Sequence, residues 1–177
     1  WLIGRQHSGE TMAEWISEGV VERLLDAQDP VERALLDHAV FYIVPNMNPD
    51  GTVRGHQRLN AAGIDLNREW LEPTPDRSPE VLCVRQQMLV RGVDFCMDAH
   101  GDENIPYVFL AARALTERIE GLRERYQAAL LETTPEFQRV HGYTADPSTP
   151  INRAVAVNYV GTTFDCVSFT LEMPFKD

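Results

Sequence analysis

His7 and Glu10 lie three residues apart near the start of the chain, in the segment His-Ser-Gly-Glu. An imidazole and a carboxylate at this spacing can point at one metal ion where a loop runs into a helix. His100, far along the chain, is a candidate for a third ligand. Two imidazoles and one carboxylate are a common protein ligand set of catalytic zinc, which keeps a fourth position for water. These three residues predict one Zn²⁺ per chain and hydrolytic chemistry.

The spacing of His7 and Glu10 is a weak signal by itself. The chain has 5 His and 27 acidic residues, so one such pair is expected by accident, and His100 and Glu103 form a second. A solvated surface pair is the alternative interpretation of either. His7 and Glu10 are favoured because they directly follow an apolar run and precede a helical pattern.

Asp65 and Asp98 are candidates for orienting the imidazoles. A metal-bound imidazole usually donates its second N–H to a carboxylate, which fixes its tautomer and direction. For Asp98, a turn residue at the end of a strand is an equally good interpretation.

Arg58, Asn67 and Arg68 lie in or beside a segment rich in Asn, Gly and Pro, residues 46–67. A guanidinium group suits two-point contact with a carboxylate, and it can also stabilise the oxyanion of a tetrahedral intermediate. These residues predict a substrate with a free carboxylate. The alternative for each arginine is a solvated surface charge.

Glu172 directly follows the nearly continuous apolar run at residues 164–171. Partial burial there would raise its pKa toward the range of a general base. A surface acid that ends a strand is the alternative. The chain has no Gly-x-Ser-x-Gly segment, which argues against a serine hydrolase.

Apolar strands and amphipathic helices alternate along the chain, which predicts an α/β layer architecture. Expected strands are residues 1–6, 39–44 (a central strand), 93–98, 107–111 and 164–171. Expected helices are residues 10–27, a short one opened by Asp29-Pro30, 79–91, 116–132 and 151–159. Residues 46–67 are expected to form a long functional loop, with a turn at Asn48-Pro49-Asp50-Gly51.

The polar candidates each follow an apolar strand. In open α/β sheets, ligands bind at the carboxyl ends of the strands. His7, the segment 46–50, His100 and Glu172 are therefore expected to converge on one site at that edge.

The composition is that of an ordinary globular chain. Its 177 residues are 44% hydrophobic and 24% charged, enough for one domain with a substantial core. A net charge of -11 argues against nucleic acid and anionic membranes as partners. Three unpaired cysteines, expected to be small apolar side chains rather than ligands, suit a reducing compartment and predict a cytoplasmic location.

The motifs and their order resemble the zinc metallocarboxypeptidases, most closely the cytosolic carboxypeptidase branch and its bacterial relatives. The residues that carry the resemblance are His-x-x-Glu, Asn-Pro-Asp-Gly, an Arg before Gly-x-Asp-Leu-Asn-Arg-x-Trp, Asp-x-His, His-Gly-Asp-Glu-x-x-Pro-Tyr and a late Thr-Leu-Glu. They extend from His7 to Glu172. The resemblance implies a mixed, twisted sheet with helices on both faces, and a catalytic domain at residues 1–177 that is incomplete at both ends.

The resemblance also implies a role for each candidate residue. His7, Glu10 and His100 would hold the zinc ion, with Asp65 orienting His7. The remaining roles are substrate carboxylate binding for Asn67 and Arg68, carbonyl polarisation for Arg58, and general base for Glu172. The substrate would be a peptide or protein, losing one residue from its C-terminus.

Several alternatives remain open at this point. The runner-up function is a zinc amidohydrolase of N-acyl amino acids, similar to aspartoacylases and desuccinylases, and a third is a zinc-bearing binding module without turnover. The family's substrate-capping tyrosine has no clear match in this sequence, and Tyr143 and Tyr159 are two open candidates. Arg153 is a speculative cation for an acidic substrate side chain, with a solvated helix residue as its alternative.

Overall fold

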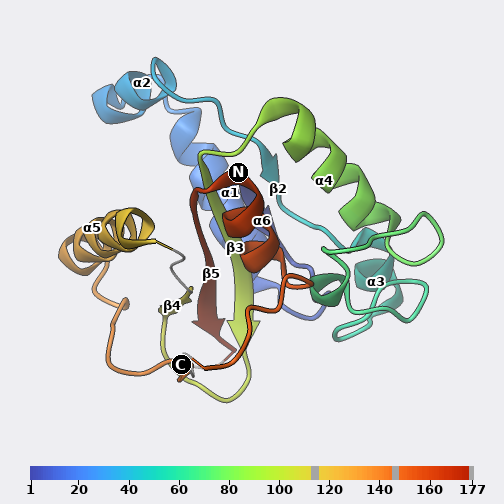
Figure 1. Cartoon of the computed structure of the whole chain (residues 1–177). Coiled ribbons are helices and arrows are strands. Elements are labelled where there is room, and N and C mark those ends of the chain that lie inside the picture. Colours follow the sequence, from blue (N-terminus) through green and yellow to red (C-terminus); the bar gives the residue numbers. More distant parts are fainter. Residues whose placement is uncertain (113–115, 145–147, 176–177) are drawn as a thin grey trace.

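Among the residues that the structure describes, five strands form one mixed sheet at the centre of the molecule (Figure 1). In the computed structural model, which describes residues 1–112, 116–144 and 148–175, the strand order is β2-β1-β3-β5-β4. The strands are β1 (Leu2–Gly4), β2 (Ile43–Val44), β3 (Phe95–Asp102), β4 (Phe109–Ala111) and β5 (Val167–Pro174). Neighbouring strands are parallel except that β4 is antiparallel to β5. The expected mixed sheet is confirmed.

Helices cover both faces of the sheet, as Figure 1 shows. They are α1 (Met12–Leu24), α2 (Pro30–Leu36), α3 (Pro49–Arg54), α4 (Pro79–Arg91), α5 (Glu117–Thr133) and α6 (Ala156–Phe164), with a 3-10 turn η1 at Leu66–Arg68. None of the helices in the described part of the chain is long and apolar enough to cross a membrane.

Alternation along β3 divides the core between the two faces. Met97 and Ala99 pack with the apolar residues of α1, and Met97 also joins the cluster beside α5. Cys96 faces the other way, into a cluster that includes Trp70 and α6 residues such as Val160. Because successive side chains of a strand point to opposite faces, Asp98 and His100 share the face of Cys96.

Two expectations about strands are wrong. The strand expected to be central at residues 39–44 is an edge strand of two residues, since only Ile43 and Val44 pair, with Leu2 and Ile3 of β1. The β-branched and aromatic run suits an edge as well as a centre, so its composition could not decide. The strands expected at 93–98 and 164–171 run on to Asp102 and Pro174, so His100 and Glu172 lie inside strands.

Two expectations about helices also need correction. The segment at 46–67 is not loop throughout, because Asn48 accepts a hydrogen bond from Gly51 N and Pro49 occupies the first turn, which together start α3 rather than a simple turn. The last helix begins at Ala156 rather than at residue 151.

Of the three cysteines, Cys96 and Cys166 are buried as expected, whereas Cys83 is exposed on α4.

Candidate active site

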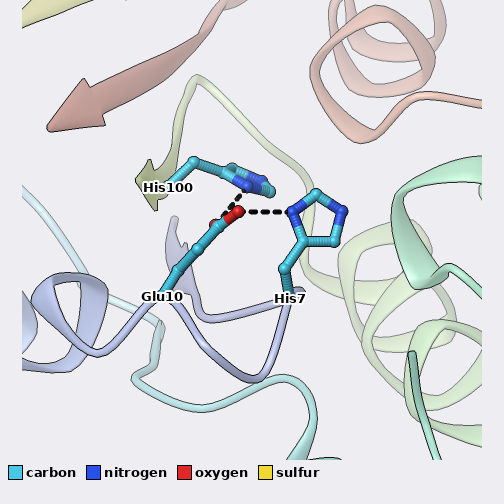
Figure 2. Close-up of side chains that lie close together, drawn as sticks. All are labelled: His7, Glu10 and His100. Carbon is cyan, nitrogen blue, oxygen red and sulfur yellow. Dashed lines mark hydrogen bonds and ion pairs between the residues drawn. The ribbon is translucent and has the colours of Figure 1, made fainter. Parts of the chain in front are cut away.

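His7, Glu10 and His100 converge in a buried cluster at the carboxyl edge of the sheet (Figure 2). The loop from β1 to α1 supplies the first two residues, and β3 supplies His100. One potential ligand atom from each lies within 4.8 Å of the others. Glu10 sits between the two rings, with Oε1 2.7 Å from His7 Nδ1 and Oε2 2.8 Å from His100 Nδ1.

The donor set fits a zinc ion. It consists of two imidazole nitrogens and a carboxylate, brought together where each residue is 6% exposed or less. Glu10 Oε2 has no well-oriented hydrogen bond among the described residues, although His100 Nδ1 is close. His7 Nδ1 contacts Glu10 Oε1 at 2.7 Å, so Oε2 is the buried oxygen of this trio that a cation between the three groups would satisfy.

The second nitrogen of each ring contacts a different carboxylate. His7 Nε2 lies 3.1 Å from Asp65 Oδ1, and His100 Nε2 lies 2.9 Å from Asp98 Oδ2. Asp65 is itself held in place, because it caps η1 by accepting from Asn67 N and accepts from Arg58 Nε. Both imidazoles are thus oriented with Nδ1 toward Glu10, as metal-binding histidines are when a carboxylate holds the other nitrogen.

The charges of the cluster are strongly coupled. Burial alone would raise the pKa of Glu10, but hydrogen bonds from His100 and His7 lower it to about 2. Burial would lower the pKa of each histidine, yet the pKa of His7 is raised by Asp65 and Glu10, and that of His100 is raised well above its usual value by Asp98 and Glu10. Protons and a metal ion would therefore compete for the same two imidazoles.

Glu172 lies next to this cluster. In the parallel pairing of β3 and β5 it is the direct partner of His100. Burial, and then the charge of Glu10, raise the pKa of Glu172 to about 7, against the opposing effects of His100 and a hydrogen bond from Tyr143. Its Oε2 is buried and has no hydrogen-bond partner among the described residues. A buried carboxyl group with a pKa near neutrality has the properties of a general base.

The cluster opens into a cleft of about 810 Å³ that Arg58, Asn67, Arg68 and Glu172 also line. Arg68 Nη1 donates to the Asn67 carbonyl oxygen at 2.8 Å, and the Asn67 side-chain oxygen accepts from Ala156 N at 2.9 Å. The structure therefore brings the proposed metal ligands, the two arginines, Asn67 and Glu172 to one cavity. The guanidinium of Arg58, bound through Nε to Asp65, remains half exposed.

Asp102 lines the cleft and was not singled out from the sequence, and it contacts Tyr143, one of the two tyrosines left open there. Tyr143 O–H is placed to donate to Asp102 Oδ2 at 2.5 Å and lies 3.2 Å from Glu172 Oε1. Of the two tyrosines left open, Tyr143 lines the cleft, whereas Tyr159 is buried against Trp70. Asp102 could have been found from the sequence because it belongs to the His-Gly-Asp-Glu segment that starts at His100.

Two further candidates lie apart from the metal cluster. Glu103, from the second His-x-x-Glu pair, contacts Gln57 at the exposed rim. Arg153, the speculative cation, contacts Thr162 on the surface and is not among the residues that line the cleft. Arg123 lines it instead, paired with Glu120.

Comparison with known proteins agrees with this geometry. Residues 1–82 match the zinc carboxypeptidase family model. A metallo-carboxypeptidase from Pseudomonas aeruginosa, solved in complex with (2-guanidinoethylmercapto)succinic acid, is 51% identical with a TM-score of 0.96, over all of this chain and 48% of that one. A metallo-carboxypeptidase from Burkholderia cenocepacia is 49% identical with a TM-score of 0.96, over all of this chain and 49% of that one.

Eukaryotic relatives are more distant. Mouse cytosolic carboxypeptidase 6 is 29% identical over 99% of this chain and 34% of its own length. The chain thus spans about half the length of the solved relatives, with 48% of the Pseudomonas protein covered, and about a third of the mouse protein. By sequence and by fold, the chain belongs to the zinc carboxypeptidase family, alongside bacterial metallo-carboxypeptidases and the cytosolic carboxypeptidases.

Proposed function

We propose that this chain carries the zinc site and the reacting side chains of a carboxypeptidase, which removes one residue from the C-terminus of a peptide or protein. The observation that carries the proposal is the convergence of three ligand atoms within 4.8 Å beside Glu172. His7, Glu10 and His100 would hold one zinc ion. When bound, the ion would supply Lewis-acid chemistry: it would polarise a carbonyl and lower the pKa of water, so that hydroxide is available as a nucleophile near neutral pH.

Glu172 is the proposed general base. With a pKa of about 7 it can accept a proton from the attacking water and then deliver that proton to the departing amine. Its place opposite His100 in the strand pairing keeps the carboxyl group beside the proposed metal site.

The cations of the cleft are proposed to hold the substrate. Arg68 and the Asn67 side chain would bind the terminal carboxylate, and Arg58 would polarise the scissile carbonyl and stabilise the developing oxyanion. The half-exposed guanidinium of Arg58 supports this role, since its Nη atoms remain available while Nε contacts Asp65.

Peptides with free and with amidated C-termini test the substrate class, with N-acyl amino acids as a third set. The free peptide is expected to be cleaved, and cleavage is expected to be lost on amidation and on chelation. Amidation removes the charged carboxylate, and a guanidinium binds a neutral amide much more weakly than a carboxylate. Turnover of N-acyl amino acids alone would favour the amidohydrolase instead. Zinc and peptide binding without any turnover would favour a binding module.

Glu172→Gln tests the base. The variant is expected to keep about one zinc per chain and to lose at least about 10²-fold in kcat, the usual contribution of a positioned general base. Glu18→Gln, an exposed substitution on α1, is the matched control and should leave kcat unchanged. Full activity of Glu172→Gln would contradict the assignment.

The cytoplasm is the proposed location. It is supported by the naming of several relatives as cytosolic carboxypeptidases and by the free state of all three cysteines.

A further inference from the structure

A chain of buried hydrogen bonds runs from Trp70 to the far side of His100. Trp70 Nε1 donates to Gln6 Oε1 at 2.8 Å, and Gln6 Nε2 donates to Asp98 Oδ2 at 2.6 Å. The same oxygen of Asp98 lies 2.9 Å from His100 Nε2. Trp70, Gln6 and Asp98 are fully buried and His100 is 2% exposed, so water does not compete for these bonds.

The donor and acceptor groups in this series of hydrogen bonds fix the orientation of the Gln6 side-chain amide. An indole N–H can only donate, so the Gln6 atom that faces Trp70 must be the oxygen. The amide NH₂ must then face Asp98, whose carboxylate only accepts. His100 Nε2 lies 2.9 Å from Asp98 Oδ2, which offers no proton, and farther, at 3.4 Å, from the amide nitrogen of Asn67. The shorter contact with the charged oxygen is the stronger one, so the proton of the neutral ring sits on Nε2. The lone pair of Nδ1 is then left pointing at Glu10, where the proposed metal ion would bind.

Gln6 also connects the two parts of the proposed metal site. It directly precedes His7, and its backbone oxygen accepts from Asn48 Nδ2 at 3.0 Å. Its side chain therefore ties the loop that carries His7 and Glu10 to the carboxylate that orients His100. A buried amide that lost either partner would leave unsatisfied polar atoms in the core, which is costly.

We propose that Gln6 and Trp70 are positioning residues for the metal site: they hold Asp98, and through it the His100 tautomer, in the metal-binding arrangement. This inference rests on the proposed zinc site. Without this inference, both residues would be regarded only as part of the core. Trp70 also packs against Tyr159, with the ring centroids 6.2 Å apart.

The test is the zinc dissociation constant of the full chain, measured by competition with a chromogenic chelator. Trp70→Phe keeps the ring and deletes the N–H, and Gln6→Met keeps the length and deletes both bonds. Each variant is expected to bind zinc about 10-fold or more weakly, the usual effect of removing a partner that orients a ligand. The double variant should be no weaker than Gln6→Met, because Trp70 acts only through Gln6.

Trp1→Phe is the matched control. Trp1 also donates its indole N–H, to the Gly92 oxygen at 2.9 Å, but it does so away from the metal cluster. Its removal should leave the zinc dissociation constant unchanged. Urea unfolding of every variant in chelator separates a loss of folding stability from a loss of metal affinity.

The outcomes are distinguishable. A wild-type chain that binds no zinc would remove the proposed function, and this inference with it. A wild-type chain that binds zinc, with both single variants within about twofold of it, would overturn this inference alone. Losses that multiply in the double variant would overturn the serial arrangement. If Gln6→Met does not fold, Trp70→Phe against Trp1→Phe decides the question.

Discussion

Glu10 and Glu172 show how one functional group takes two opposite roles within a single cleft. Both are 6% exposed, yet the pKa of Glu10 falls to about 2 and that of Glu172 rises to about 7. Burial raises both values, but two imidazole contacts reverse its effect at Glu10, whereas the charge of His100 and one tyrosine hydroxyl do not reverse it at Glu172. The environment thus suits one carboxyl group to the proposed role of metal ligand and leaves the other able to take up a proton.

The raised pKa of Glu172 predicts a pH-dependent loss of stability. A group whose folded pKa exceeds its unfolded value stabilises the fold below the unfolded pKa, here about 4.5, and that stabilisation is lost as pH rises through about 7. In chelator, the unfolding free energy of Glu172→Gln relative to wild type should therefore increase between pH 5 and pH 8, by on the order of 3 kcal/mol. Urea titrations at the two pH values measure it, and a pH-independent difference would contradict the raised pKa.

At the scale of elements, the loop between β1 and α1 places two of the proposed ligands within four residues. Gly9 makes this possible because the backbone of Gln57 lies against it: Gly9 N donates to the Gln57 oxygen, and a Cβ on Gly9 would lie 2.8 Å from that atom. Only glycine permits such a close approach of two backbone segments. The position of Gly9 between His7 and Glu10 links this packing directly to ligand geometry.

Gly9→Ala is accordingly expected to weaken zinc binding by about 10-fold or more, because the backbone rather than a flexible side chain would have to move. Gly19→Ala is the control. Gly19 lies on α1 with nothing within 4 Å of an added Cβ, so alanine there should leave zinc binding unchanged and stabilise the helix by about 0.5–1 kcal/mol. Chelator competition and thermal melts measure the two effects. Equal zinc affinity in both variants would show that the close approach is unimportant.

At the scale of the whole molecule, the chain concentrates buried carboxyl groups around one point. Glu10, Asp98 and Glu172 are all buried there in a protein whose net charge is already -11. Like charges in a dry interior destabilise the fold, and a divalent cation would relieve that repulsion. Folding and metal binding are therefore expected to be coupled.

Zinc should raise the melting temperature more at pH 8 than at pH 6. A ligand that binds only the folded chain at 100 times its dissociation constant adds about 2.7 kcal/mol of stability. At pH 6 this gain shrinks, because His7 and His100, with their raised pKa values, hold protons that zinc must displace. Melts with zinc, magnesium and chelator at both pH values measure the effect. An equal gain with magnesium would argue against the nitrogen-rich site.

The amino-acid sequence alone predicted which side chains meet at the proposed site and the type of most elements. The proposed ligands, the Arg58 and Arg68 cations and the final glutamate are properties of residue type and order. Pro79 is a local signal of a helix start, and the helix expected from Pro79 to about Arg91 is α4. The extent of strands was less accessible, because local composition does not say how far a neighbour will pair with a strand. This is why His100 and Glu172 lie within strands rather than after them.

The tertiary structure decided everything that depends on contacts between distant segments. It placed residues 43–44 at the sheet edge, set His100 opposite Glu172, and chose Nδ1 of each imidazole to face Glu10. It also brought Tyr143 rather than Tyr159 into the cleft. Each of these outcomes follows from long-range strand pairing and close packing, in which a residue's neighbours come from segments tens of residues away and leave no trace in its local spacing.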